Sequence, residues 1–210
     1  MRLARRLQST GIDQTHVGSI RRVCLIGADC TGKTTLSQEL ALHFGTVSVP
    51  EFARCFLEAR SGRFSYSDMA RIAKGQLGLE HAAWPKAHRV LLCDGSPLAT
   101  SVWSLRYFDR VSRTVDQLAR TSRYDLYLFT RIDIPWTPDS LRDSEQWRSW
   151  LDAKCEELLK ARSLPFVSVS GDREQRFKTA MRAVEALLIP PNDQGPSHHD
   201  SRIRRDSAMG

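Results

Sequence analysis

The residues with the clearest chemistry lie between Gly27 and Thr34, where the chain reads Gly-Ala-Asp-Cys-Thr-Gly-Lys-Thr. This segment fits the phosphate-binding loop pattern G-x-x-x-x-G-K-[ST] at every fixed position. Successive backbone N–H groups of such a loop, with the positive end of the following helix, can surround two phosphates of a nucleotide. Lys33 would carry a mobile positive charge toward the terminal phosphates, and Thr34 would offer a hydroxyl to magnesium.

The sequence therefore predicts a site for ATP and Mg²⁺, and a chance match in an unrelated turn is the alternative. Cys30 lies inside the loop, whose positive field could favour a thiolate; a small residue tolerated by the turn is the alternative. The residues expected to bind the nucleotide are Gly27, Ala28, Asp29, Cys30, Thr31, Gly32, Lys33, Thr34 and Thr35.

Asp94 ends the apolar run Val90–Cys93. An apolar strand that ends on an acid delivers a carboxylate to the edge of the sheet, where it can bind magnesium through water or accept a proton from a substrate hydroxyl. A helix N-cap is the alternative, but Ser96, followed by Pro97, is better placed for that task. We expect Asp94 to have a catalytic or magnesium-binding role.

Glu51 and Arg54 follow the second predicted strand and are candidates for the acceptor side of the reaction. Glu51 could hold a sugar hydroxyl, and Arg54 could hold an anionic group. The alternative is an acid at a helix start and a surface ion pair beside it.

Residues 133–143 form a charged segment stiffened by two prolines, Asp-Ile-Pro-Trp-Thr-Pro-Asp-Ser-Leu-Arg-Asp. Trp136 could stack on a planar ring, and Arg142 could move over the transferring phosphoryl group to neutralise its charge. Closure of this segment would exclude water, which a kinase needs in order not to hydrolyse its ATP. An ordinary loop with Trp136 in a minor core is the alternative.

Two further groups of residues allow two interpretations each. Gly171 and Asp172 could lie against adenine, since glycine lets backbone approach a flat ligand; Asp172 could instead only cap the last helix. One helical segment could line the acceptor pocket or present a solvated face with one core aromatic, through Asp68, Gln76, Glu80 and Trp84.

The elements that would position these residues alternate along the chain. Short apolar or β-branched runs predict strands at Val23–Ile26, Thr46–Val49, Val90–Cys93, Asp125–Phe129 and Phe166–Val169. Helical periodicity fills the gaps at 33–44, 52–60, 67–84, 97–108, 112–121, 145–162 and 173–188. Such alternation predicts an α/β fold with a parallel sheet, helices on both faces and the ligand at the carboxyl ends of the strands.

Composition indicates one domain with two appendages in 210 residues. We expect a flexible basic arm at 1–20, the domain at 21–189 and a disordered polar tail at 190–210. No run approaches the roughly 18 apolar residues of a membrane span. Much of the net charge of +7 lies in the arm, which argues against a nucleic-acid surface on the domain. Five cysteines without a C-x-x-C pair predict reduced thiols and a cytoplasmic location.

Together these residues resemble the kinase-type P-loop proteins of the nicotinamide riboside kinase family, as found in the C-terminal domain of NadR proteins. The resemblance runs from about Arg22 to Leu188 and rests on residues 27–35, 51–54, 92–94 and 133–143. It implies an ATP- and magnesium-dependent phosphotransferase with a three-layer αβα sandwich and strand order 2-3-1-4-5. It further implies that Lys33 and Thr34 bind phosphate and magnesium, that Asp94 acts at the acceptor hydroxyl and that 133–143 forms a lid. Arg131 stands where this family more often has an acidic or small residue.

The leading hypothesis is a small-molecule kinase that transfers the γ-phosphate of ATP to a ribonucleoside such as nicotinamide riboside. A stand-alone ATPase or nucleotide switch that acts through a macromolecular partner is the alternative. A polynucleotide-end kinase has only the basic arm in its favour. Oligomeric state has no signature in the sequence.

Overall fold

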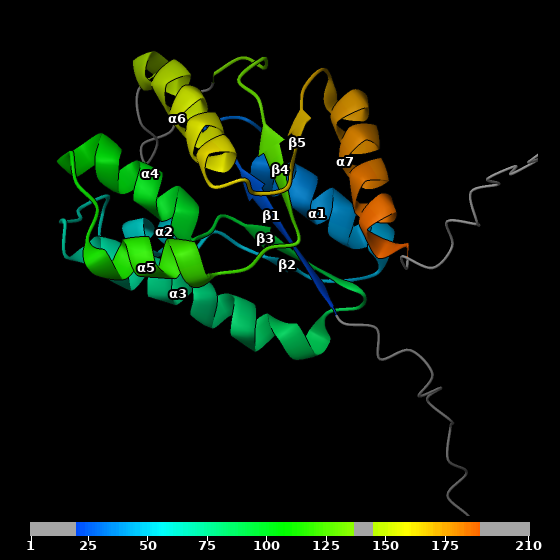
Figure 1. Cartoon of the computed structure of the whole chain (residues 1–210), viewed down its shortest axis with the longest axis horizontal. Coiled ribbons are helices and arrows are strands. Elements are labelled where there is room, and N and C mark those ends of the chain that lie inside the picture. The colour runs from blue at the N-terminus through cyan, green and yellow to red at the C-terminus, as the bar shows by residue number, and fades with distance from the viewer. Residues whose placement is uncertain (1–19, 137–144, 190–210) are drawn as a thin grey trace, which may run out of the picture.

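The computed structural model describes residues 20–136 and 145–189, in which five parallel strands form one sheet with helices on both faces (Figure 1). The strand order is β2-β3-β1-β4-β5, as the resemblance implied. Every neighbouring pair is parallel, so the strands end at one common edge. The strands are β1 (Arg21–Ile26), β2 (Ser48–Val49), β3 (Val90–Asp94), β4 (Leu126–Thr130) and β5 (Phe166–Val169).

The helices follow the predicted periodicity closely. They are α1 (Lys33–Phe44), α2 (Phe52–Glu58), α3 (Asp68–Ala83), α4 (Pro97–Phe108), α5 (Arg113–Thr121), α6 (Arg148–Ala161) and α7 (Arg173–Leu188). Two short 3₁₀ turns adjoin them, η1 (Trp84–Lys86) and η2 (Glu145–Trp147). These turns explain two boundary differences: α3 ends before a 3₁₀ turn that contains Pro85, and α6 begins three residues later than expected.

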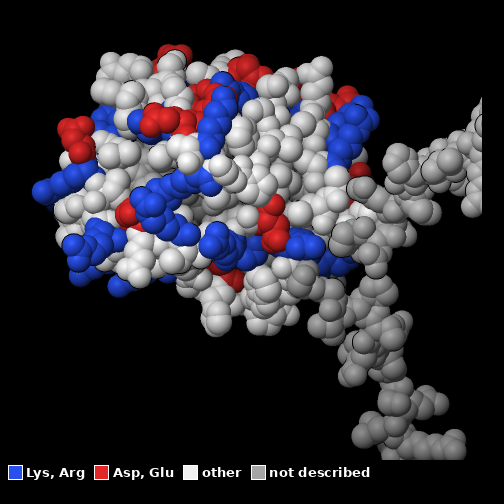
Figure 2. Space-filling view, in the orientation of Figure 1, with Lys and Arg blue, Asp and Glu red and all other residues white. Residues whose placement is uncertain are grey.

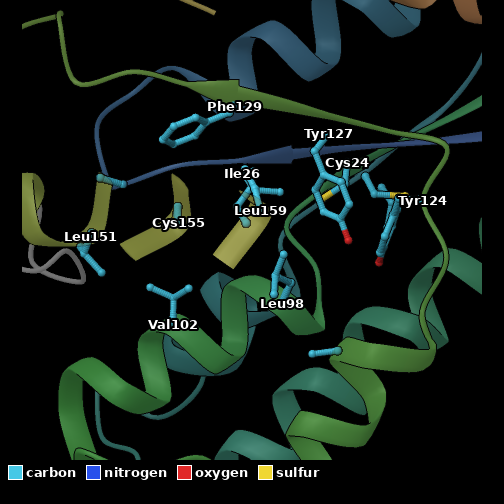
Figure 3. Close-up of a cluster of buried hydrophobic side chains, with 14 of the residues drawn as sticks. Cys24, Ile26, Leu98, Val102, Tyr124, Tyr127, Phe129, Leu151, Cys155 and Leu159 are labelled. Carbon is cyan, nitrogen blue, oxygen red and sulfur yellow. The ribbon is translucent and has the colours of Figure 1, made fainter. Parts of the chain in front are cut away.

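The core lies on both faces of the sheet, because alternate residues of each strand point to opposite sides. On one face the strands pack against α1 and α7 through Leu25, Leu40, Leu92, Leu128 and Val184. On the other face they pack against α4 and α6 through Ile26, Leu98, Phe129, Leu151 and Leu159 (Figure 3). The buried sheet explains why the strands read as continuous apolar runs rather than alternating ones.

All five cysteines are free, and two of them lie side by side in this core. Cys24 of β1 pairs in register with Cys93 of β3, and both are fully buried. Burial raises the pKa of the Cys24 thiol well above its ordinary value, so the reactive thiolate form is disfavoured there. The cytoplasmic location stays a prediction. In the described part of the chain, no helix has the length and apolar character needed to cross a membrane.

Three of the four residues singled out on the predicted acceptor-side helix are buried, so their interpretation as a solvated face with one core aromatic is wrong. Asp68, Gln76 and Glu80 are each less than 5% exposed, whereas Trp84 is 38% exposed. Asp68 accepts hydrogen bonds from Ser65 and pairs with arginines, and Glu80 pairs with Arg22 and Tyr124. Of these three side chains, Gln76 lies beside Gly95, at the edge of the sheet that also carries the phosphate-binding loop.

Gly75 and Gln76 of α3 hold α2 against α3. Gln76 Oε1 accepts a hydrogen bond of 2.9 Å from the Phe52 backbone N–H. A Cβ atom on Gly75 would collide with the Phe52 ring, so only glycine permits this approach. Because Glu51 precedes Phe52 directly, the contact also fixes the place of Glu51.

Charged side chains of both signs are interspersed on the face that carries α4, α5 and α6, with Lys and Arg in excess (Figure 2). Some of these charges pair within one helix, as Arg120 does with Asp116 at 2.8 Å, and others between helices, as Arg162 does with Asp116 at 3.2 Å. Exposed pairs of this kind contribute little to stability, about 0–1 kcal/mol each.

Two glycines on the same helix give a matched test of the α2–α3 packing. Gly75→Ala should lower the free energy of unfolding by about 1–3 kcal/mol, because the Phe52 ring must move. Gly78→Ala should raise it by about 0.5–1 kcal/mol, because that position is exposed and has no atom within 4 Å of the added Cβ. Urea unfolding of both variants measures the difference, and equal effects would contradict the close α2–α3 contact.

Candidate functional site

The loop between β1 and α1 has the backbone conformation that its glycines allow. Gly32 has φ 77°, and Cys30, a non-glycine residue, has φ 56°. Gly27 leaves β1 against the end of β4, and a Cβ atom there would collide with the carbonyl oxygen of Thr130. The Thr31 hydroxyl lies 2.8 Å from the Thr130 hydroxyl, which ties the middle of the loop to the same strand end.

Lys33 lies over the loop that it follows. Its Nζ donates to the carbonyl oxygens of Gly27 at 3.1 Å and Ala28 at 2.8 Å. The Thr31 hydroxyl donates to the same Ala28 oxygen at 2.8 Å. The ammonium group is therefore within reach of any anion that the loop surrounds.

Asp94 and Thr34 meet at the ends of β3 and the loop. The Thr34 hydroxyl donates to Asp94 Oδ2 at 2.6 Å, and Asp94 is 1% exposed. Ser96 caps α4 by accepting from the Ala99 N–H at 3.3 Å, so the expectation that Ser96 rather than Asp94 serves as the cap is confirmed.

The same pair of side chains fits a magnesium ion. Asp94 Oδ1 is buried and has no hydrogen-bond partner in residues 20–136 and 145–189, and the Thr34 hydroxyl keeps its lone pairs because it donates its proton to Oδ2. No cluster of three or more His, Cys, Asp or Glu residues with metal-binding geometry occurs in residues 20–136 and 145–189. Magnesium suits such a site, since it keeps several waters and takes substrate phosphates as ligands.

A cavity of about 230 Å³ lies beside the loop, between α2, α3 and α4. Its charged residues are Asp29 of the loop together with Glu51 and Arg54, so these three residues lie at one cavity. The remaining walls are formed mostly by apolar and aromatic side chains: Leu57, Phe64, Met69, Ile72, Trp103 and Tyr107. The Trp103 and Tyr107 rings are stacked with centroids 5.9 Å apart, and Phe64 meets Tyr107 edge-on at 4.9 Å.

Glu51 is a cavity residue with a strongly perturbed acidity. Burial raises the pKa of its carboxyl to about 7, and the negative charges of Asp94 and Asp29 act in the same direction. Lys33 and Arg54 act against the shift. A carboxyl that titrates near neutral pH can take or hold a proton from a hydroxyl group beside it.

Segment 131–136 leaves β4 and passes over the loop. A Cβ on Gly32 would lie 3.8 Å from the Ile134 side chain. Trp136 is partly buried, its Nε1 has no hydrogen-bond partner among the residues that the structure describes, and it is not among the residues that line the cavity. Stacking of Trp136 on the acceptor stays a prediction. Arg142, expected over the phosphates, lies outside the described residues, as do residues 137–144 of the predicted lid.

Arg131, the residue unusual for the family, is held by α6. Its guanidinium pairs with Asp152 at 2.9 Å and Glu156 at 2.8 Å, and it covers the Phe129 ring at 4.6 Å. Ion pairing with Arg131 and with Lys160 lowers the pKa of Glu156 to about 2. Arg131 thus belongs to the packing of α6 on the sheet.

The turn before α7 has a structural task of its own. Asp172 accepts from the Gln175 N–H at 2.9 Å and Gln175 Oε1 accepts from the Asp172 N–H, which makes a capping box. A Cβ on Gly171 would collide with Gln175, and the Gly171 N–H donates to Asp133. Asp172 therefore serves as the N-cap of α7. Contact of Gly171 or Asp172 with adenine stays a prediction.

Two buried arginines near the loop were not predicted from the sequence. Arg148 of α6 and Arg176 of α7 are 7% and 6% exposed, and both donate to carbonyl oxygens of the phosphate-binding loop. The aromatic cavity residues Phe64, Trp103 and Tyr107 were missed as well. Arginine and aromatic residues on helices have no diagnostic spacing, so only the packed structure brings them to the site.

Comparisons with known proteins agree with this geometry. A family model described as an AAA domain matches residues 22–176. The trifunctional NAD biosynthesis/regulator protein NadR of Salmonella typhimurium strain LT2 is 30% identical over 183 residues, 84% of this chain and 44% of that protein. The crystal structure of a NadR protein in complex with NR aligns with TM-score 0.69 at 22% identity, over 80% of this chain and 52% of that one. A deoxyadenosine kinase from M. mycoides with bound dATP aligns with TM-score 0.55 at 15% identity, over 79% and 99%.

The acidity of Glu51 predicts a pH-dependent stability. Glu51 ionises at about pH 4.5 in the unfolded chain but only at about pH 7 in the folded protein. The free energy of unfolding of wild type should therefore fall as the pH rises from about 4.5 to about 7. The melting temperature of Glu51→Gln, measured against wild type, should therefore rise over this interval and level off above it. Glu58→Gln, an exposed acid of the same helix, serves as control. A difference that is independent of pH would contradict the raised pKa.

Proposed function

The chain belongs to the AAA domain family and is a NadR-like P-loop protein, and we propose on this basis that it is an ATP-dependent kinase of a nucleoside. The observation that carries the proposal is the cavity beside the phosphate-binding loop, with Asp29 of the loop in its wall. A nucleotide switch needs the loop but has no use for a second pocket of this kind. The cavity therefore favours phosphoryl transfer to a bound small molecule.

At the nucleotide end, the backbone of residues 27–34 would surround the β- and γ-phosphates of ATP, with Lys33 turned from the loop carbonyls to the phosphate oxygens. Thr34 and Asp94 would hold the magnesium ion, which would neutralise part of the phosphate charge. Since Asp94 is bonded to Thr34 and is not part of the cavity wall, its place fits the metal better than the acceptor.

At the acceptor end, we propose that Glu51 receives the proton. The acceptor hydroxyl oxygen would attack the γ-phosphorus, the bond from the γ-phosphorus to the β–γ bridging oxygen would break, and ADP would leave. The hydroxyl proton would pass to the Glu51 carboxylate, whose pKa of about 7 suits a proton acceptor at neutral pH. Arg54, in the same wall, would hold an anionic or hydroxyl group of the acceptor.

Nicotinamide riboside is the proposed acceptor. The support comes from the NadR relative and from the solved NadR complex with NR. The aromatic wall formed by Phe64, Trp103 and Tyr107 suits a flat ring, and the acids Asp29 and Glu51 suit ribose hydroxyls. A purine nucleoside is the closest competitor, since a deoxyadenosine kinase shares the fold.

A nucleoside panel tests the proposal. Purified protein is incubated with ATP, magnesium and each nucleoside in turn, and products are followed by mass. We expect a mass gain of one phosphate on nicotinamide riboside, with formation of ADP. Phosphorylation of another nucleoside alone would correct the acceptor, and ATP left unconsumed with every nucleoside would remove the kinase proposal.

Lys33→Ala should lower turnover by about two to three decades, because one lost charge at the transferring phosphate costs several kcal/mol in the transition state. The fold should remain, since Lys33 bonds only to loop carbonyls in the described structure. Lys178→Ala removes an exposed lysine paired with Glu174 and should leave turnover unchanged. Turnover near that of wild type in folded Lys33→Ala would contradict the role given to the lysine.

A further inference from the structure

Two arginines from different helices bind consecutive carbonyl groups of the phosphate-binding loop from outside. Arg148, the first residue of α6, donates from Nη2 to the Cys30 oxygen at 3.5 Å and to the Ile134 oxygen at 2.9 Å. Arg176, in the first turn of α7, donates from Nη1 to the Thr31 oxygen at 2.9 Å. Neither arginine is among the residues that line the cavity.

Arg176 also connects the loop to two neighbouring segments. Its Nε donates to the Gly171 oxygen at 2.8 Å, and its Nη2 donates to the Arg131 oxygen at 2.9 Å and to the Asp133 carboxylate. Although burial acts to raise it, the Gly171 N–H and Arg176 hold the pKa of Asp133 below its ordinary value. The planar guanidinium fork thus satisfies four acceptors at once, which a lysine ammonium cannot do in this geometry.

Because the peptide bond is planar, these contacts with carbonyl groups also fix the directions of N–H groups in the loop. In a trans peptide the C=O of one residue and the N–H of the next point in opposite directions, and all peptides described here are trans. A Cys30 oxygen held outward by Arg148 fixes the direction of the Thr31 N–H. A Thr31 oxygen held outward by Arg176 does the same for the Gly32 N–H.

Stability alone does not account for the position of these arginines. Both lie in the first turn of a helix, where the positive helix end disfavours a cation. Both are buried, and within the described chain Arg148 Nε has no hydrogen-bond partner. Asp133 compensates part of this charge for Arg176, and a polyanion on the inner side of the loop would add to that compensation for both arginines.

We propose that Arg148 and Arg176 are positioning residues that hold the Cys30 and Thr31 carbonyls outward and so orient the next two N–H groups toward the nucleotide phosphates. The inference rests on the proposed function, because it needs the loop to bind a nucleotide. Removal of the two arginines should weaken phosphate binding through the backbone and leave the acceptor cavity as it is.

The test measures the affinity for a fluorescent ADP analogue with magnesium, beside the melting temperature without nucleotide. Arg148→Met and Arg176→Met should each weaken binding at least about fivefold, since a hydrogen bond from a charged group to the loop is lost. Arg148→Lys and Arg176→Lys should recover part of the loss. In turnover, the KM for ATP should rise more than kcat falls, and the KM for the acceptor should not change.

Arg173→Met is the matched control, because Arg173 lies three residues before Arg176 at the start of α7, is exposed and pairs with Glu39. It removes the same charge and should leave nucleotide affinity unchanged. Wild-type affinity in the Arg148 and Arg176 variants, or an equal loss in Arg173→Met, would overturn the proposal. Failure of the lysine variants to fold would also overturn the proposal, because it would show that the arginines are needed for folding rather than for orienting the loop. A wild-type protein that does not bind the analogue would instead remove the proposed function.

Discussion

The structure depends on one constraint: the backbone between β1 and α1 is held in a single defined shape, which the proposed function needs so that its N–H groups can face a polyanion. Gly27 is wedged against Thr130, Thr31 is bonded to the same strand end, and Gly32 takes a left-handed conformation. The parallel sheet makes this possible, since β1, β3 and β4 all end at that edge. A preformed loop needs no reorganisation when the phosphates arrive.

The acceptor cavity lies at the same edge of the sheet, but charge repulsion and apolar packing determine its properties. Asp29, Glu51 and Asp94 lie close enough for their charges to interact, and the neutral form of Glu51 is one way in which this repulsion is relieved. A second way is the positive charge of Lys33 and, in the proposed reaction, of magnesium. The helices α2 to α4 add an apolar and aromatic pocket to the acids, so that a flat ring and its hydroxyl groups have separate places.

The sequence predicted the framework because the framework follows local rules. Apolar strands that end in polar residues, and a loop with two glycines at fixed spacing, identify the sheet edge, Lys33, Thr34 and Asp94 without any long-range information. The cavity could not be predicted in this way, since it depends on how closely α2 approaches Gly75 and on which face of α4 carries Trp103 and Tyr107. Arg148 and Arg176 were missed for the same reason: their partners are backbone carbonyls more than 100 residues away.

The most direct test of the account is calorimetric titration of the folded chain with ATP in the presence and absence of magnesium. The account predicts saturable binding at one site per chain, stronger with magnesium present. Absence of any binding of ATP or GTP to well-folded protein would contradict it, because every role assigned to the loop, to Asp94 and to the cavity beside them starts from a bound nucleotide.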